Sequence, residues 1–286
     1  MPGARYYYRM DIPNRTLNSG SAIPQVGFGL WKNTDESECK QSIEWALQAG
    51  YRHFDTAQAY GNEQWLGEVL AGHLSQGGPL KRQDLFVTTK IAVQNFGHGH
   101  THKSFDESFK KLKLDQVDLL LLHFPVSLLR DKSWQALEEI YASGRAKSIG
   151  VSNYTIRHLE HLLDRAKIKP AVNQVELHVF LQQPELVDYC KAHDIVVEAY
   201  SPLAHGQGLD NQVLADIGAK YNKSATQVML RWCVEQGTVP LPKSVHQDRI
   251  AANLDIFDFK LDSDDLAKIK GLEQGLRTCW DPTHIP

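Results

Sequence analysis

Residues 85–123, LFVTTKIAVQNFGHGHTHKSFDESFKKLKLDQVDLLLLH, contain the pattern that decides the fold. Two apolar runs, Leu85–Lys90 and Val117–His123, flank a segment, Ser104–Lys113, whose apolar residues recur at three- and four-residue spacing. Short β-branched or leucine-rich runs are typical of buried strands, and the wider spacing is typical of an amphipathic helix. A strand, a crossover helix and a second strand predict two parallel neighbours in one sheet.

The same alternation runs through most of the chain. The eight predicted strands are Val26–Gly29, His53–Asp55, Leu85–Lys90, Val117–His123, Ala146–Ser152, Ala171–Glu176, Val196–Tyr200 and Val239–Pro242. Predicted helices between them include Glu36–Gln48, Glu63–Ser75 and Trp134–Ala142. Eight strand–helix units in about 250 residues match a (β/α)8 barrel, whereas an open doubly wound sheet usually has a glycine-rich phosphate fingerprint near its start. The predicted fold class is therefore α/β, a single TIM barrel.

Several segments extend this minimal barrel. They are a hairpin at about 12–24, one of the two helices Gln212–Tyr221 and Thr226–Glu235 between the seventh and eighth strands, a helix at Ser263–Glu273, and a tail at 276–286 without regular structure. The sequence Asn18-Ser19-Gly20 between short extended runs is a turn signal and predicts the hairpin. Because no linker or low-complexity stretch interrupts the chain, residues 1–286 are expected to form one domain, with the C-terminal helix and tail at about 260–286.

Composition excludes several classes of protein. The chain is 42% hydrophobic and 23% charged with a formal net charge of -3, and it has no run of lysine and arginine that would neutralise a phosphate backbone. No nucleic acid partner is expected. The longest apolar run is far shorter than the roughly 20 residues of a membrane span, so no membrane association is expected. We expect a monomer.

The cellular compartment is inferred from the N-terminus and the cysteines. The sequence MPGARYYYRMD lacks the apolar segment of a secretory signal, which favours a cytoplasmic location. The four cysteines, Cys39, Cys190, Cys233 and Cys279, show no paired or zinc-like spacing and fit free thiols in a reducing compartment. The run Tyr6–Tyr8 has no explanation in these patterns.

Three ionisable residues end three consecutive predicted strands. They are Asp55, Lys90 and His123. Taken singly, Asp55 could cap a helix, Lys90 could be a surface lysine and His123 a core histidine. Neighbouring strands lie about 4.8 Å apart, and active sites of TIM barrels are at the C-terminal ends of the strands. Together, the three side chains predict a functional site.

A tyrosine follows the first of these residues. Tyr60 lies in FDTAQAYGNE, where the chain leaves the strand that ends at Asp55. A free phenol titrates near ~10 and needs a nearby cation to become a useful acid at neutral pH. Lys90 is the candidate cation, Asp55 would orient it, and His123 could bind the substrate oxygen or the Tyr60 hydroxyl. Such a set of groups suits protonation of an oxyanion.

The ordered motifs FDTAQAYGNE, TTK, LLLLHFP, IGVSN, VNQVELH, YSPL and PKSV resemble those of the aldo-keto reductases. The resemblance runs from Gly27 to about Phe259. It implies that Asp55, Tyr60, Lys90 and His123 form the catalytic tetrad, with Tyr60 as proton donor. It also implies a nicotinamide cofactor bound without a Rossmann fold, and the sequence contains no G-x-G-x-x-G after a strand.

The resemblance implies a set of cofactor contacts. The carboxamide would be bound by Ser152, Asn153 and Gln174, and the nicotinamide ring would stack on Tyr200. The pyrophosphate would lie along Ser201 and Leu203. The 2′-phosphate would be held by Lys243, Ser244 and Arg249, and the adenine would meet Asn253. Without the resemblance, Ser152-Asn153 could be a helix cap and Tyr200 a core aromatic, and the predicted phosphate residues could be a solvated helix start. Two charge-assisted contacts of ~1.5 to 3 kcal/mol each predict a preference for NADPH, with NADH bound more weakly.

The chain also departs from the common pattern. Phe124 stands where many members have Trp, Ala252 where many have an acidic residue, and His246-Gln247 where Thr-Pro is common.

Trp31 resembles the residue that lines the pocket floor, and Trp280 is a candidate for one wall, although both could be structural. The loops at 124–133 and 204–211 are short, which predicts an open pocket for a small-molecule carbonyl, either a small aldehyde or a sugar-like ketone.

His98, His100 and His102 alternate in a glycine-containing stretch after the third strand. A metal site is one interpretation, and a solvated turn is the other. We expect no metal, because neither a carboxylate nor a cysteine nearby in the sequence completes a ligand set.

Three functions remain open from the sequence. The first is an NADP-dependent oxidoreductase that reduces aldehydes or ketones to alcohols by hydride transfer, of the alcohol dehydrogenase (NADP+) type. The second is an NADPH-binding regulatory or structural barrel without significant turnover. The third is a barrel isomerase or aldolase that uses Lys90 as a Schiff-base nucleophile, which would leave the predicted 2′-phosphate site without a purpose.

Overall fold

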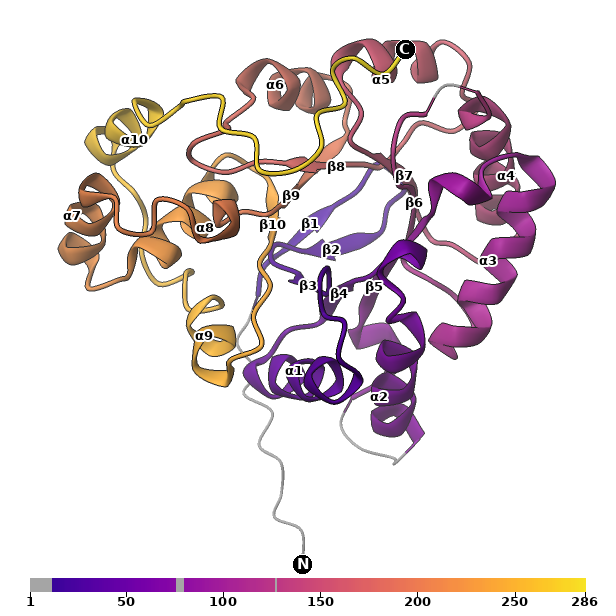
Figure 1. Cartoon of the computed structure of the whole chain (residues 1–286), viewed down its shortest axis with the longest axis horizontal. Helices are drawn as coiled ribbons and strands as arrows, with labels where there is room; N and C mark the ends of the chain where they lie inside the picture. The colour runs from indigo at the N-terminus through magenta and orange to yellow at the C-terminus, as the bar shows by residue number, and fades with distance from the viewer. Residues whose placement is uncertain (1–11, 76–79, 127) are drawn as a thin grey trace, which may run out of the picture.

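The computed structural model describes residues 12–75, 80–126 and 128–286, so Tyr6–Tyr8 and the N-terminal sequence considered above lie outside it. Eight parallel strands form one sheet in chain order, surrounded by helices (Figure 1). The strands are β3 (Phe28–Gly29), β4 (His53–Asp55), β5 (Phe86–Ile91), β6 (Leu119–Leu122), β7 (Ile149–Ser152), β8 (Val172–Glu176), β9 (Val196–Tyr200) and β10 (Val239–Leu241). The predicted TIM barrel is confirmed, with most strands one to three residues shorter than expected.

Two glycines close the barrel between its first and last strands. The backbone N–H groups of Gly27 and Gly29 donate to the carbonyl oxygens of Pro240 and Pro242, each over 3.0 Å. A β-carbon on Gly27 would lie 2.5 Å from a methyl group of Leu241. Side chains at this seam would therefore push the two strands apart, which explains why glycine occupies the position.

Helices cover the outside of the barrel. They are α1 (Glu36–Ala49), α2 (Glu63–Ser75), α3 (His98–Leu112), α4 (Arg130–Ala142), α5 (Ile156–Leu163), α6 (Pro184–Ala192), α7 (Gln212–Tyr221), α8 (Ala225–Glu235), α9 (Gln247–Ala252) and α10 (Ser263–Lys270). Local chemistry sets the ends of α1, since the Asp35 side chain accepts a hydrogen bond from the Glu38 N–H and Gly50 adopts a left-handed conformation with φ 113°. None of the helices in the described ranges is long and apolar enough to cross a membrane.

The predicted hairpin is present and fills one end of the barrel. Strands β1 (Asn14–Thr16) and β2 (Ala22–Pro24) pair in an antiparallel manner. Leu17 and Ile23 of the hairpin join a buried cluster with side chains from inside the barrel, among them Phe86 and Leu121. This apolar plug lies at the N-terminal ends of the strands, so the polar strand ends can meet only at the opposite end.

Two expectations about helices need correction. Helix α3 begins at His98, six residues before the predicted start at Ser104, so the alternating histidines lie in a helix and not in a turn. The buried face of α3 includes Thr101 and Ser108, and polar residues on a buried face do not give an apolar periodicity. The last helix ends at Lys270, before the predicted Glu273, and the tail that follows has no helix or strand, as expected.

Helix α2 packs so closely on α3 that it allows no side chain at Gly67, where a β-carbon would lie 2.2 Å from the Lys111 carbonyl oxygen. We expect Gly67→Ala to lower the free energy of unfolding by about 1–3 kcal/mol, because the two helices must separate. Gly72→Ala in the same helix is the control, since nothing lies within 4 Å of its β-carbon. It should be neutral or stabilising by up to about 1 kcal/mol. Urea unfolding of both variants measures the difference, and equal stabilities would contradict the packing.

Candidate active site

Lys90 is the centre of a buried polar cluster at the C-terminal ends of the strands. Its ammonium group lies 2.6 Å from Asp55 Oδ1, 3.1 Å from the Thr56 carbonyl oxygen and 3.0 Å from the Tyr60 hydroxyl. The Lys90 side chain is completely buried. Since β4 and β5 are paired neighbours, the register brings the Asp55 and Lys90 side chains together. The structure therefore brings together the residues that the sequence predicted at these strand ends.

Tyr60 and His123 complete the predicted set of four. Tyr60 ends a short 3-10 helix, Gln58–Tyr60, which Gly61 terminates with φ 73°. His123 follows β6, and its ring meets the Tyr60 ring edge-on with centroids 5.5 Å apart. Both side chains are half-buried, whereas Lys90 and Asp55 lie beneath them. The phenol and the imidazole are thus the members of the set that a ligand can reach.

Burial and charge act in opposite directions on these groups. Burial favours the neutral form of Lys90, but the neighbouring Asp55 and Tyr60 outweigh it and raise the pKa of Lys90 above its ordinary value. Burial raises the pKa of Tyr60, and the Lys90 ammonium offsets this only in part. Lys90 therefore lowers the pKa of Tyr60, as predicted, but burial raises it more, so the phenol is less acidic here than a free phenol. Tyr60 is a protonated phenol at neutral pH.

His123 is a neutral imidazole at neutral pH. Burial, followed by the charge of Lys90, lowers the pKa of His123 to about 3. A neutral ring with one N–H can donate a hydrogen bond to a ligand oxygen without adding a charge to the site.

A second layer of polar groups supports Asp55 from below. The Gln174 amide donates to Asp55 Oδ2 over 2.9 Å and to Glu198 Oε2 over 2.8 Å. Burial and the nearby Asp55 raise the pKa of Glu198 to about 8. His53 Nε2 lies 3.4 Å from Glu198 Oε1, but burial lowers the pKa of His53 to about 3, so this contact joins two neutral groups at pH 7 and is not an ion pair.

Four of the predicted cofactor residues form a continuous layer across β7, β8 and β9. The Tyr200 hydroxyl donates to Asn153 Oδ1 over 2.7 Å, and Asn153 Nδ2 donates to the His123 carbonyl oxygen over 3.0 Å. The Ser152 hydroxyl donates to the Gln174 carbonyl oxygen over 2.9 Å. Asn153 has φ 67°, a left-handed conformation that turns its amide towards Tyr200 and His123.

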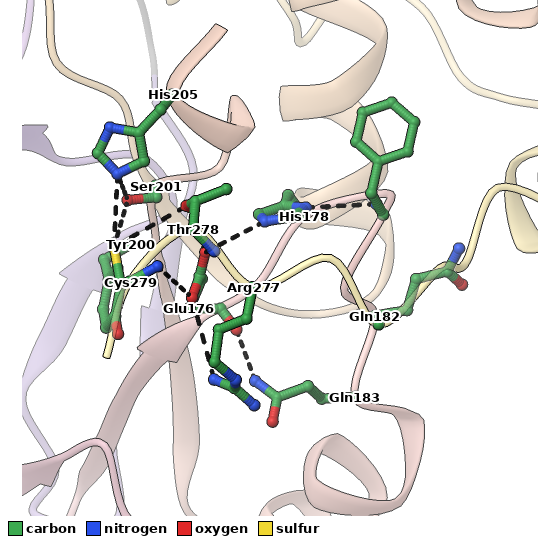
Figure 2. A network of polar contacts seen from close by, with 12 residues as sticks. Glu176, His178, Gln182, Gln183, Tyr200, Ser201, His205, Arg277, Thr278 and Cys279 are labelled. Carbon is green, nitrogen blue, oxygen red and sulfur yellow. Dashed lines mark hydrogen bonds and ion pairs between the residues drawn. The ribbon is translucent and has the colours of Figure 1, made fainter. Parts of the chain in front are cut away.

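The C-terminal tail lies across the ends of β8 and β9 (Figure 2). Glu176, a buried carboxylate at the end of β8, accepts hydrogen bonds from the backbone N–H groups of Thr278, over 2.7 Å, and Cys279, over 3.2 Å. Burial alone would raise the pKa of Glu176, but hydrogen bonds from His178 and the tail lower it below its ordinary value. The tail is therefore held by an ionised carboxylate.

The predicted pyrophosphate residues lie under this tail. The Ser201 hydroxyl lies 3.1 Å from His205 Nε2 and 3.6 Å from the Cys279 sulfur, and Ser201 has φ 47° (Figure 2). Leu203 is half-buried beside them. Loop 201–206 and the tail are thus in contact with each other, through Ser201, His205 and Cys279.

The predicted 2′-phosphate residues lie around the start of α9, which packs on α1. Lys243 and Arg249 are exposed, whereas Ser244 and Asn253 are buried. In the part of the chain that the structure describes, neither Lys243 nor Arg249 pairs with a carboxylate, so both charges can meet an anion. The Ser244 hydroxyl accepts a hydrogen bond from the His246 N–H over 3.1 Å.

Aromatic side chains lie at the surface beside the buried polar cluster. Trp280 in the tail is 82% exposed and meets Phe124 edge-on with ring centroids 6.2 Å apart. Trp31 is 38% exposed and meets His205 edge-on with centroids 5.3 Å apart. The predicted pocket residues therefore lie at the rim, where a small molecule can contact them from solvent.

Sequence reasoning missed Glu176, Glu198 and the tail contact of Cys279. A signal for the two glutamates is present, since Glu176 ends the buried strand VNQVE and Glu198 lies within VVEAY, and a charged residue in a buried strand needs a partner. Glu176 meets the tail at Thr278, and Glu198 meets Gln174 of another strand, so the pattern could indicate a buried site but not its geometry.

Glu198 should make the stability of the protein depend on pH. Because its folded-state pKa, about 8, exceeds its ordinary value of 4.5, the folded protein holds this proton more tightly, and the stabilisation is lost as pH rises through that range. We expect Glu198→Gln to become more stable than wild type between pH 5 and 8, by on the order of 2–4 kcal/mol at the upper end. Urea unfolding across this range measures the free energy of unfolding, with the exposed Glu107→Gln as control. If the free energy of unfolding changed with pH in the same way in wild type and Glu198→Gln, the assignment would be contradicted.

Comparison with known proteins gives the family of the chain. Residues 25–274 match the profile of the aldo/keto reductase family. Glyoxal reductase of Bacillus subtilis (strain 168) is 43% identical over 94% of this chain and 96% of its own length, and methylglyoxal reductase DkgA of Escherichia coli (strain K12) is 40% identical over the same shares. A silkworm aldo-keto reductase complexed with NADPH superposes with a TM-score of 0.92 at 35% identity, over 97% of this chain and 94% of that one. The chain therefore belongs to the aldo/keto reductase family of oxidoreductases.

Proposed function

We propose that this protein reduces aldehydes or ketones to alcohols with NADPH, and that Tyr60 protonates the carbonyl oxygen. The observation that carries the proposal is the contact of 3.0 Å between the Tyr60 hydroxyl and the buried, charged Lys90. As a proton leaves the phenol, the growing negative charge lies beside a fixed ammonium group in a site with little water.

The residues at the mouth fit a nicotinamide dinucleotide phosphate. Two exposed cations without carboxylate partners in the described residues, Lys243 and Arg249, flank the buried Ser244 and suit a phosphate. Asn153, Gln174 and Tyr200 would hold the nicotinamide end, and Asn253 the adenine end. Relatives of this chain have been crystallised with NADPH and with NADP, which supports the choice. When bound, the cofactor supplies the hydride.

The charge states of the site assign a task to each side chain. His123, neutral at pH 7, can donate a hydrogen bond to the carbonyl oxygen and orient it towards Tyr60. Tyr60 then transfers its proton to that oxygen. Lys90 stabilises the phenolate that remains, and Asp55 keeps Lys90 charged and in place. A charged Lys90 is a poor nucleophile, which speaks against the Schiff-base alternative.

Small aldehydes are the substrates that the mouth favours among the candidates. The rim consists of separate aromatic side chains, Trp31 on one side and Phe124 with Trp280 on the other. Relatives at 40–43% identity are named for the reduction of glyoxal and methylglyoxal, which are both small dicarbonyl compounds. Sugar-like ketones remain the other class that an open mouth would admit.

Tyr60→Phe should lower kcat for methylglyoxal by about 10²- to 10⁴-fold, because the ring is kept while the proton is lost. NADPH oxidation measures the rate, and quenching of protein fluorescence by NADPH measures cofactor affinity, which should stay within about twofold of wild type. A variant that retains most of its activity would refute Tyr60 as the proton donor. Loss of NADPH binding would instead show that the phenol holds the cofactor.

Arg249→Ala should weaken NADPH binding by about 10- to 150-fold and leave NADH binding almost unchanged, because one charge-assisted phosphate contact is lost. The dissociation constants of both cofactors are measured by the same fluorescence titration. The exposed Lys132→Ala on α4 is a control for loss of one positive charge away from α9. Equal losses for NADPH and NADH would place Arg249 outside the 2′-phosphate site.

A further inference from the structure

Two histidines and a glutamate form a cluster on the outside of the barrel that the proposed reductase chemistry does not use. His98 and His102 lie in the first turns of α3, and Glu139 lies near the end of α4. His98 Nε2 is 3.0 Å from Glu139 Oε1, and His102 Nε2 is 2.9 Å from Glu139 Oε2. All three ligand atoms lie within 4.8 Å of one another.

The helical setting is what makes the cluster possible. Residues four apart lie on the same face of a helix, so the first and third of the alternating histidines point to the same side, with ring centroids 5.1 Å apart. His100 lies between them in sequence but is not part of the cluster. The expectation that no carboxylate completes a ligand set is wrong, because packing of α4 on α3 brings Glu139 to the two rings.

We propose that His98, His102 and Glu139 bind a divalent transition-metal ion of the zinc class. Two imidazoles and a carboxylate are ligands that zinc prefers, whereas magnesium and calcium prefer sites made of oxygen atoms alone. Bond lengths of ~2.0–2.1 Å in a tetrahedral site place ligand atoms ~3.3 Å apart. The two histidine nitrogens lie 3.0 and 2.9 Å from separate oxygens of Glu139, and the three ligand atoms lie within 4.8 Å of one another, so rotation of these exposed side chains can bring them to this spacing.

Exposure of the three side chains favours metal entry. The side chains of His98, His102 and Glu139 are 46%, 32% and 58% exposed, so an ion reaches them without opening the fold. Hydrogen bonds and ion pairs at such exposed positions contribute little to stability, and a metal ion therefore displaces only weak interactions. The ligands beyond these three would be water.

The ion would fasten two neighbouring strand–helix units of the barrel. Helix α3 follows β5, which carries Lys90, and α4 follows β6, after which His123 stands. A metal bound only by the folded arrangement of α3 and α4 stabilises the folded protein. The site lies on the outer helices, so it is expected to affect stability and not the proton transfer by Tyr60.

Calorimetric titration of tag-free protein with zinc chloride tests the site. Wild type should bind one Zn²⁺ that His102→Ala and Glu139→Gln each bind at least about tenfold more weakly. His100→Ala is the matched control, since it removes an exposed imidazole from the same helix and should bind like wild type. Zinc should also raise the thermal midpoint of wild type and His100→Ala by several degrees more than that of His102→Ala, and magnesium should not.

Cobalt(II) gives a second measurement that does not depend on stability. Wild type should develop the intense visible absorption of a four-coordinate cobalt site, and His98→Ala should lose most of it. Unchanged zinc affinity in both His102→Ala and Glu139→Gln, or a cobalt spectrum identical to that of the hydrated ion, would overturn the proposal. NADPH-dependent activity plays no part in either readout, so failure here leaves the proposed reductase function intact.

Discussion

The buried ion pair between Lys90 and Asp55 is the interaction on which the rest of the site depends. An ammonium group with no exposure to solvent is costly unless its charge and its hydrogen-bond donors are satisfied. Asp55, the Thr56 carbonyl oxygen and the Tyr60 hydroxyl provide those partners. Asp55 in turn needs Gln174 to bind its second oxygen. The barrel thus keeps one cation in place by a chain of partners drawn from several strands.

The polarity of the barrel explains why this chain of partners forms at one end. Leu17 and Ile23 of the hairpin fill the N-terminal end with apolar side chains. At the other end lie the polar residues Asp55, Ser152 and Glu176, which end their strands. Glu176 fastens the C-terminal tail across β8 and β9. Apolar side chains therefore lie below the site, while Trp31 and Trp280 at its rim are exposed to solvent.

The site keeps its charges balanced at neutral pH. Lys90 and Asp55 carry opposite charges, whereas burial keeps His53 and His123 neutral and Glu198 largely protonated. Tyr60 is protonated as well. A balanced site avoids the cost of an isolated buried charge. The proton stays on Tyr60, which lies between the buried Lys90–Asp55 pair and a ligand.

The sequence by itself determined the eight strands, the hairpin and the four residues Asp55, Tyr60, Lys90 and His123, because periodicity and strand ends are local properties of the chain. Only the tertiary structure decided which distant partners these and other side chains meet. Glu198 meets Gln174, which also binds Asp55; Glu176 meets the tail, and Glu139 meets two histidines of another helix. The direction of the pKa shift of Tyr60 also depended on the fold, since burial and the charge of Lys90 oppose each other and only their positions in space decide which is larger.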